Sequence, residues 1–437
     1  MSLITVIGGG PAGLATCYYA KKQEIEFVLF EADSEVGGNC KTRSFGSFKY
    51  DTGAHRFHDR SPEVTDEVRK LLDNDLLEVV SASHVYIQGQ YFVFPPAISN
   101  LFLNLKFSIL ARVLFENIKN RLQPAKKLQN FKEYACQRYG KSLATLFLLN
   151  YSSKLWGLDC SLLSTSIAGS RLKGLKFSDF IFRSKVSLEG MRFYYPRHGY
   201  GQICDALADK SGRECVKLGS KITKILHEKS RITAIEVNHK EVVPVEYLVS
   251  SIPLHHLIHL LQPALPSDVL NIANSIKFRD LILVVLQINR PKVTCSATVY
   301  FPDKEFPFTR VFEPKNRSAM MAPSDQTSLV IEVPIDSGQT LDAGELEQVK
   351  NEVIEKLLTL DWFARSELMD SRIDLVKFAY PIFDLELEGK NQAIVKELSS
   401  FGNLHICGRN ANLQYSWMHD MFHYGKKAVE CYVSKTN

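Results

Sequence analysis

The fold is decided by the stretch Ile4-Thr5-Val6-Ile7-Gly8-Gly9-Gly10-Pro11-Ala12-Gly13 and the residues that follow it. A β-branched run and a glycine turn precede a helical pattern over residues 14–22, and a second strand over residues 26–30 ends in Glu31. This order is typical of the βαβ unit that binds a dinucleotide. Glu31 can accept hydrogen bonds from a ribose diol, and its charge disfavours a 2′-phosphate in that pocket.

The glycines and the start of the helix predict separate contacts with this dinucleotide. Gly8 is expected to form the tight turn, Gly10 to let the backbone approach a pyrophosphate, and Gly13 to let helix and strand pack closely. The pyrophosphate is expected at the helix N-terminus, beside Pro11 and Ala12, because free N–H groups and the helix dipole favour an anion there.

The next segment resembles a signature of one large flavoprotein family. Asp33-Ser34-Glu35-Val36-Gly37-Gly38-Asn39 is similar to the acid-then-Gly-Gly pattern of the family that includes amine oxidases, protoporphyrinogen oxidases and UDP-galactopyranose mutases. The resemblance implies that Gly37 and Gly38 lie against the phosphates of FAD, and it favours FAD over NAD. Classical amine oxidases have an arginine where this chain has Asn39, as mutases do. The resemblance therefore makes Asn39 a cofactor residue and favours the mutase branch.

Two histidines follow in Tyr50-Asp51-Thr52-Gly53-Ala54-His55-Arg56-Phe57-His58. Their spacing alone is compatible with a metal pair that lacks a third ligand nearby, or with satisfied core histidines. The family resemblance implies that Gly53, His55 and Arg56 lie against the isoalloxazine ring. It also implies that His55 and His58 line the flavin or its substrate side, which makes both candidates for catalysis.

Two aromatic residues are candidate substrate contacts. Tyr151-Ser152-Ser153-Lys154-Leu155-Trp156-Gly157-Leu158 resembles the mutase stretch in which Lys-x-Trp-Gly presents a tryptophan to the substrate's nucleotide. A tryptophan between helices is also a common core residue, so both interpretations of Trp156 stay open. Tyr415 matches a mutase tyrosine and is expected to contact substrate, although Gln414 stands where mutases have an arginine.

Arg310 lies in Phe306-Pro307-Phe308-Thr309-Arg310-Val311-Phe312-Glu313-Pro314, which resembles the mutase segment whose arginine binds the substrate's diphosphate. Strand alternation would send Arg310 to one face with Phe308 and Phe312. An arginine on an aromatic face needs an anionic partner, which is either a buried carboxylate or a ligand. We treat Arg310 as a candidate for both substrate binding and catalysis. Mutases also have tyrosines near a second phosphate arginine, and residues 331–334 offer none.

The C-terminal part is expected to return to the cofactor. Leu404-His405-Ile406-Cys407-Gly408-Arg409-Asn410 predicts a strand and a Gly-Arg turn, followed by a helix over residues 418–433. In the family, such a strand and helix N-terminus hold the pyrophosphate and the pyrimidine edge of the flavin, and the matched positions are Gly408, Arg409 and Met418.

A strand over residues 216–225 is expected to run alongside the adenine, with Ile222 as its matched position. Some relatives attach FAD covalently through cysteine or histidine. Cys407 is the candidate thiol near the flavin segment, and we expect it to be packed. The expected cofactor is therefore non-covalent FAD.

The predicted fold class is α/β, with a Rossmann-like FAD-binding domain on a parallel sheet and an inserted, partly helical α+β substrate domain. The FAD-binding domain is expected to use residues 1–94, 196–262 and 381–437. The substrate domain is expected to use residues 95–195 and 263–380, with residues 97–180 mostly helical.

Composition excludes several functional classes. The 437 residues are 45% hydrophobic, enough for a large core, and the net charge of +5 is spread along the chain, which disfavours nucleic acid as a partner. Nine scattered cysteines without a C-x-x-C pair argue against a metal site and for a reducing compartment. The first strand begins within three residues, so we expect no leader and a cytoplasmic location. Residues 98–115 are too polar and short for a membrane span; they predict an amphipathic helix, packed on the body or touching a membrane surface.

Two classes of function remain open, besides a flavin-binding protein without activity. An oxidoreductase would move a hydride through the flavin, acting on an unidentified small-molecule substrate that is anionic or a nucleotide sugar. A UDP-galactopyranose mutase-like enzyme would instead isomerise a sugar ring through reduced flavin without net redox change. The oxidoreductase is the preferred hypothesis, and an oligomer is compatible with it.

Overall fold

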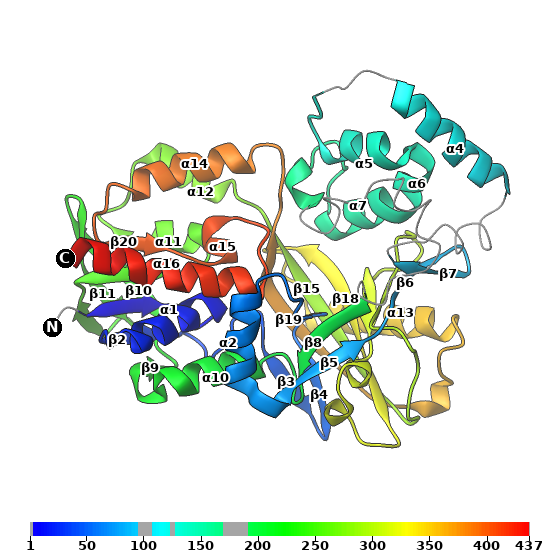
Figure 1. The fold of residues 1–437 in the computed structure, drawn as a ribbon, viewed down its shortest axis with the longest axis horizontal. Helices are drawn as coiled ribbons and strands as arrows, with labels where there is room; N and C mark the ends of the chain where they lie inside the picture. Colours follow the sequence, from blue (N-terminus) through cyan, green and yellow to red (C-terminus); the bar gives the residue numbers. More distant parts are fainter. Residues whose placement is uncertain (1–2, 95–106, 123–126, 169–190, 437) are drawn as a thin grey trace.

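The computed structural model describes residues 3–94, 107–122, 127–168 and 191–436. A parallel sheet carries the N-terminal motif (Figure 1), and its strand order is β20-β13-β1-β2-β9. Its strands are β20 (Leu404–Ile406), β13 (Tyr247–Ser250), β1 (Ile4–Ile7), β2 (Phe27–Phe30) and β9 (Val216–Lys217). All four pairings are parallel, which confirms the predicted Rossmann-like sheet.

Helices cover this sheet, since its strands are almost fully buried. On one face lie α1 (Pro11–Lys22), α10 (Gln202–Ser211) and the long α16 (Met418–Thr436). Beside α10 runs α2 (Pro62–Leu72). The other face packs on a smaller sheet, ordered β12-β11-β10-β14, together with three helices. These elements are β10 (Ile222–Glu228), β11 (Arg231–Val237), β12 (Glu241–Pro244), β14 (Leu261–Gln262), α11 (Leu254–Leu260), α12 (Ser267–Asn274) and α14 (Leu387–Leu398).

The predicted continuous strand over residues 216–225 is wrong. Residues 216–217 pair with β2 in the parallel sheet as β9, whereas β10 begins at Ile222 in the smaller sheet. Between them the backbone turns at Gly219, whose φ is +62°, and the amide of Ser220 donates to Glu31 O at 2.7 Å. A glycine in this left-handed conformation ends one strand and directs the next into a different sheet.

A second large sheet has seven strands in the order β19-β15-β18-β17-β16-β6-β7. They are β19 (Leu368–Pro381), β15 (Phe278–Ile288), β18 (Thr327–Asp336), β17 (Arg310–Phe312), β16 (Thr298–Tyr300), β6 (Ser83–Ile87) and β7 (Gln90–Phe94). Every neighbouring pair is antiparallel except β16 and β6. The buried strand predicted over residues 281–288 lies within β15, all of whose residues are buried.

The seven-stranded sheet is flanked by a helix and a hairpin. Helix α13 (Ala343–Leu358) packs on one face, and the hairpin β3 (Thr42–Phe45) and β4 (Phe48–Asp51) meets the other through Tyr50. A separate ribbon pairs β5 (Leu76–Val80) with β8 (Arg192–Pro196). Strands β6 and β7 come before residue 95, yet they belong to this sheet. The division of the chain into five domain segments stays a prediction.

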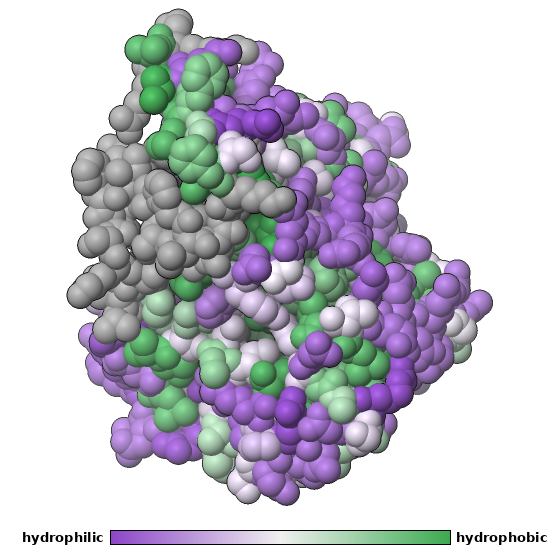
Figure 2. All heavy atoms as spheres, turned by 90° about the vertical axis from the view of Figure 1, so that its right-hand side faces the viewer, coloured by the Kyte–Doolittle hydropathy of each residue, from purple (hydrophilic) through white to green (hydrophobic). Residues whose placement is uncertain are grey.

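Helices form a lobe beside β6 and β7 (Figure 1), as predicted for the described part of residues 97–180. The lobe contains α4 (Phe107–Leu122), α5 (Phe131–Tyr139), α6 (Lys141–Ala144), a π-helical turn (Thr145–Leu149) and α7 (Asn150–Trp156). Helix α4 buries Leu110 and Val113 against the lobe but leaves Phe107 83% and Phe115 68% exposed. Figure 2 shows hydrophobic residues near the top of the molecule, where this helix lies.

The predicted amphipathic helix therefore exists from residue 107 onward, and residues 98–106 of that prediction lie outside the described residues. Within the described part of the chain, no helix combines the length and apolar character that a membrane crossing requires.

Candidate functional site

A cavity of about 500 Å³ connects the parallel sheet, the seven-stranded sheet and the helical lobe. Its wall begins at the carboxyl ends of three parallel strands, at Gly8 after β1, Glu31 after β2 and Ser251 after β13. It continues past the turn at Gly408, which follows β20, and reaches Trp156 at the end of α7. Ligands of open parallel sheets bind at this edge, so the cavity is the candidate site.

The glycine loop has the geometry that the sequence predicts. A Cβ on Gly13 would lie 2.0 Å from Gly8 O, so only glycine allows this contact between α1 and the β1 turn. A Cβ on Gly10 would meet nothing nearer than the Cα of Gly38, at 4.0 Å. Gly10 therefore faces open space in the cavity wall, with Pro11 and Ala12 beside it at the start of α1. This cradle fits a pyrophosphate at a helix N-terminus.

The acidic residue and the second glycine pair close this end of the cavity. Glu31 accepts hydrogen bonds from the amides of Gly9 and Asp33, so its carboxylate lies directly beside the glycine loop. Gly37 donates its amide to Gly9 O at 2.8 Å and does not itself line the cavity, whereas Gly38 does. This hydrogen bond therefore holds the loop that contains Gly37 and Gly38 against the glycine loop after β1.

His55 lies in the cavity wall, stacked on Tyr200 with 4.9 Å between ring centroids. Its Nε2 is 2.9 Å from the carbonyl oxygen of Asn39. A carbonyl can only accept, so Nε2 carries the proton and Nδ1 is an acceptor. Burial, with Arg409 and Arg310 nearby, lowers the pKa of His55 to about 3. The imidazole is therefore neutral at physiological pH.

The other residues of this segment have different surroundings. Arg56 lines the cavity, donates to Thr298 Oγ1 and lies over the ring of Phe193. Gly53 is buried beneath the imidazole of His55, since a Cβ there would lie 3.1 Å from Nε2. His58 is not among the described residues that line the cavity; its ring meets Trp417 edge-on, at 6.1 Å. A catalytic role for His58 stays a prediction.

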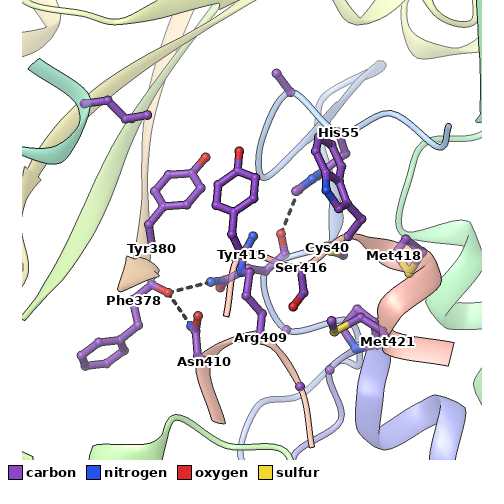
Figure 3. A pocket seen from close by; sticks show the side chains of 18 of the residues that line it. Cys40, His55, Phe378, Tyr380, Arg409, Asn410, Tyr415, Ser416, Met418 and Met421 are labelled. Atoms are coloured by element: carbon purple, nitrogen blue, oxygen red, sulfur yellow. Dashed lines mark hydrogen bonds between the residues drawn. The ribbon is translucent and has the colours of Figure 1, made fainter. Parts of the chain in front are cut away.

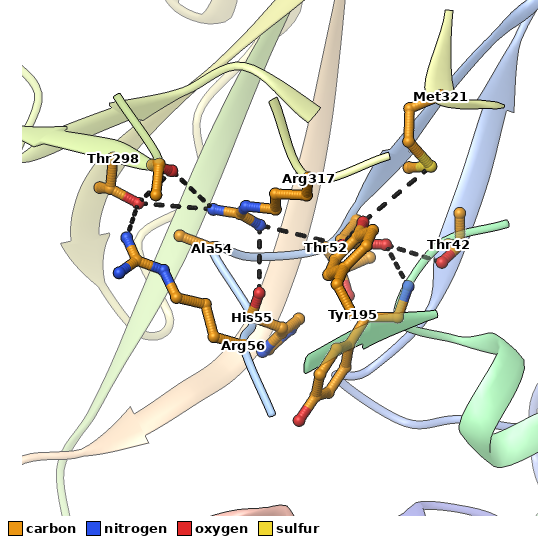
Figure 4. A network of polar contacts seen from close by, with 12 residues as sticks. Thr42, Thr52, Ala54, His55, Arg56, Tyr195, Thr298, Arg317 and Met321 are labelled. Carbon is orange, nitrogen blue, oxygen red and sulfur yellow. Dashed lines mark hydrogen bonds and ion pairs between the residues drawn. The ribbon is translucent and has the colours of Figure 1, made fainter. Parts of the chain in front are cut away.

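A buried polar network lies behind His55 (Figure 4). Arg317 donates to His55 O at 3.2 Å and to Ala297 O at 3.2 Å, and its guanidinium is 4.0 Å from the carboxylate of Asp51. Asp51 accepts from the hydroxyl of Tyr195 and from the amide of Tyr200. Burial raises the pKa of Asp51 and lowers the pKa of Arg317. No local sequence pattern predicts this network, which holds the His55 backbone in place.

The C-terminal residues meet the cavity from its other side (Figure 3). Gly408, Arg409 and Met418 line it, and Met418 begins α16, so the first N–H groups of that helix lie at the cavity. Cys407 is fully buried and lies 3.9 Å from the hydroxyl of Thr16. A different thiol, Cys40, lines the cavity, and burial raises its pKa to about 11.

A bulge in β19 is fastened to these cofactor segments. Phe378 has a φ of +51°, and its amide donates to Asp280 Oδ1 at 2.7 Å. Its carbonyl accepts from the side chains of Asn39, at 3.2 Å, and Asn410, at 2.7 Å. Arg409 donates to the next carbonyl. The bulge therefore links the seven-stranded sheet to Asn39 in the N-terminal cofactor segment and to Arg409 and Asn410 in the C-terminal one.

Arg310 lies between a carboxylate and a phenol. Its Nε forms an ion pair with Glu332, which is fully buried, and its Nη2 donates to the hydroxyl of Tyr380 at 2.7 Å. Glu332 also accepts the amide of Ala54 at 2.9 Å. Arg310 lines the cavity, and its Nη1 makes no hydrogen bond to a described residue. Both interpretations of Arg310 thus have support, because it has a buried carboxylate partner and it also lines the cavity.

Aromatic residues surround this arginine. Tyr151 and Tyr300 meet edge to face at 5.4 Å, and Tyr300 pairs with Arg310 in the β16–β17 register. Trp156 is 3% exposed, meets Tyr380 edge-on at 5.7 Å and still lines the cavity. Tyr415 lines it too, near Trp417. The predicted substrate residues therefore gather at one end of the cavity, with phenols that the sequence analysis did not assign.

One predicted cofactor residue lies elsewhere. Ile222 is 8% exposed at the start of β10, and it packs into the hydrophobic core instead of lining the described cavity wall. Its contact with an adenine stays a prediction. Among the described residues, no group of three or more histidine, cysteine or acidic side chains has the arrangement of a metal site.

The family model described as flavin containing amine oxidoreductase matches residues 11–431, nearly the whole chain. The chain belongs to this family. The suspected family membership is thereby confirmed, and the protein is a flavoenzyme of the amine oxidase type. The family implies a flavin cofactor, and the glycine cradle beside α1 lies in the wall of the cavity.

Known proteins of the same fold include a mutase and an amine oxidase. The chain is 25% identical over 223 residues to "Probable UDP-galactopyranose mutase" of Klebsiella pneumoniae, a match that covers 47% of this chain and about half, 53%, of that protein. The structure of reduced UDP-galactopyranose mutase gives a TM-score of 0.86 at 19% identity, over 100% of this chain and 96% of the other. Cyclohexylamine oxidase from Brevibacterium oxydans gives 0.69 at 13% identity, over 100% of both chains. The predicted fold class is therefore confirmed.

Proposed function

We propose that the protein is an FAD-dependent oxidoreductase whose substrate is a small molecule with one anionic group, bound by Arg310. The observation that carries this proposal is the ion pair of Arg310 with the buried Glu332. The cavity wall also carries Arg56, Lys377 and Arg409, so it favours an anion. Because Glu332 already neutralises Arg310, this arginine can bind a single carboxylate, whereas a diphosphate would bring a second negative charge next to Glu332.

We further propose that the flavin is FAD and is held without a covalent bond. Gly10, Gly38 and the start of α1 would hold the pyrophosphate, and Glu31 would bind the ribose. Cys407 is packed against Thr16, and the raised pKa of Cys40 keeps that thiol protonated and weakly nucleophilic. A thiol attachment is therefore disfavoured at both positions.

The chain's own residues would bind and orient the substrate. When bound, the flavin supplies the hydride acceptor, so no side-chain nucleophile is required. Arg310 would bind the anionic group through Nη1, while Glu332 and Tyr380 fix the orientation of the guanidinium. His55, neutral and fixed through Asn39 O, would offer Nδ1 as a hydrogen-bond acceptor and would not act as an acid near pH 7. The N-terminus of α16 would stabilise negative charge on the reduced cofactor.

The second candidate is a mutase-like enzyme that isomerises a nucleotide sugar through reduced flavin. The TM-score of 0.86 with UDP-galactopyranose mutase favours it, as does the placement of Tyr151 and Trp156 in the cavity wall. Against it stands Glu332, which already occupies one side of the arginine expected to bind a diphosphate. For either candidate we keep the cytoplasm as the proposed location, because all nine cysteines are free thiols.

Ligand titration of the oxidised flavoprotein tests this proposal. Benzoate should perturb the flavin absorbance spectrum, and UDP-galactose should bind at least about tenfold more weakly, because its second negative charge would lie next to Glu332. Arg310→Lys, which keeps a positive charge beside Glu332 but loses the forked guanidinium, should weaken benzoate binding by about 1.5–3 kcal/mol, the scale of a charge-assisted hydrogen bond. Tighter binding of UDP-galactose than of benzoate would favour the mutase instead.

A further inference from the structure

Part of the cavity wall is apolar. Six lining residues form it, and none has a polar side chain: Val85, Phe94, Phe147, Leu148, Ile167 and Ala168. Leu148 packs against two separate hydrophobic clusters, one with Phe94 and one with Ile167, so it lies where they meet. We call these six residues the apolar arm.

The apolar arm begins one aromatic ring away from the charged end. Phe94 lies 5.8 Å from the ring of Tyr300, and Tyr300 is the residue paired with Arg310 across the β16–β17 ladder. A ligand whose anionic group lies on Arg310 therefore passes Tyr300 and enters the arm within the length of a short chain. The two chemical environments belong to one cavity.

We propose that the substrate is amphipathic, with an anionic group on Arg310 and an apolar chain or ring in the apolar arm. This inference rests on the proposed function and adds the class of substrate. Each methylene buried in such an arm gains about fourfold in affinity. A nucleotide base fits the arm poorly, because its buried donors and acceptors would find no partner among these six side chains.

Calorimetric titration of the oxidised flavoprotein with butanoate, hexanoate and octanoate tests the arm. Octanoate has four more methylenes than butanoate, so it should bind on the order of 100-fold more tightly. Octan-1-ol, which lacks the charge, should bind at least about tenfold more weakly than octanoate. Because these ligands are not turned over, the readout does not depend on activity.

A variant pair separates the arm from nonspecific binding. Leu148→Asp places a carboxylate in the arm, so octanoate affinity should fall at least about tenfold while butanoate affinity stays within about twofold. Leu146→Asp is the matched control, because Leu146 is half-buried on the same π-helical turn but is absent from the described cavity wall. This control should leave the chain-length dependence unchanged.

The remaining outcomes distinguish the two proposals. Carboxylates that bind without any dependence on chain length would refute the arm and leave the anion site intact. Octanol that binds as tightly as octanoate would refute the anion site of the proposed function and leave the arm. If no carboxylate binds, or if Leu146→Asp abolishes the length dependence as Leu148→Asp does, the inference is wrong.

Discussion

Replacing Arg310 with methionine should destabilise the fold through the carboxylate that it leaves behind. Glu332 is 0% exposed, and Arg310 is its ion-pair partner. In Arg310→Met, Glu332 keeps one hydrogen bond, from the amide of Ala54 at 2.9 Å. Breaking a buried pair by removing one partner costs about 3–5 kcal/mol, so we expect a loss of this size in the free energy of unfolding.

A double variant in which both members of the ion pair are replaced by neutral residues is the matched control. In Arg310→Met/Glu332→Gln, the glutamine carbonyl can still accept the amide of Ala54, and no buried charge is left without a partner. Replacing a buried ion pair by neutral groups of similar volume is often close to neutral. The double variant should therefore recover most of the loss and lie within about 1–2 kcal/mol of the wild type.

Urea unfolding followed by tryptophan fluorescence measures both effects. All proteins are compared at the same excess of flavin, because a bound ligand stabilises the folded state by mass action. If Arg310→Met unfolds at the wild-type midpoint, Glu332 is not the partner that the ion pair indicates. If the double variant is no more stable than Arg310→Met, the loss comes from packing and not from an uncompensated charge.

Three further variants test the cofactor site and its pH dependence. Gly10→Ala should fold normally yet lose most of its flavin, because its Cβ meets no protein atom nearer than 4.0 Å but enters the cradle. Gly13→Ala should fold poorly, because its Cβ meets Gly8 O. Flavin content and circular dichroism distinguish the two variants, and a flavin-saturated Gly10→Ala would contradict the cradle. Acid precipitation should release all flavin from the wild type and from Cys40→Ser, and colour left in the wild-type pellet would contradict non-covalent binding. Because the folded-state pKa of His55 is lowered to about 3, the unfolded chain binds a proton that the folded chain excludes, so stability should fall as pH drops from about 6.5 towards 4. His55→Gln should show a shallower fall in urea midpoints over this range, and an unchanged slope would mean that His55 is not held neutral.

Local sequence order predicts the cofactor end of the molecule well. The strand, glycine turn and helix of residues 4–22 are adjacent in sequence, and the role of Gly13 follows from their contact alone. The strand and helix after residue 403 are likewise local patterns. Such elements are set by short-range geometry, so a single sequence is sufficient to find them.

The substrate end depends on contacts between distant segments. Arg310 and Glu332 face each other because β17 and β18 pair in one register, and Tyr380 joins them from β19. Glu332 is the one polar residue in the run of residues 329–333, which is a usable signal, because a lone acid in a buried strand needs a cationic partner. The lack of a tyrosine in residues 331–334 does not reveal this pair.

The register of distant strands also explains the other omissions. Tyr151, Tyr300 and Tyr380 come from a helix and two strands, and no sequence spacing brings them together. Asp51, at the end of β4, and Arg317, in a loop more than 260 residues later in the sequence, also meet only in the folded chain. Residues that meet only through strand pairing can be assigned to the site only after that pairing is known.

The measurement that tests the proposed function most directly is turnover of the reduced protein. The dithionite-reduced flavoprotein is incubated anaerobically with UDP-galactopyranose, and the furanose form is followed by chromatography. A mutase would turn over many times without consuming reductant, because its flavin returns to the reduced state in each cycle. We expect no appreciable furanose, since Glu332 neutralises one of the two arginines that a diphosphate would need. Many turnovers per flavin would contradict the oxidoreductase and establish the mutase.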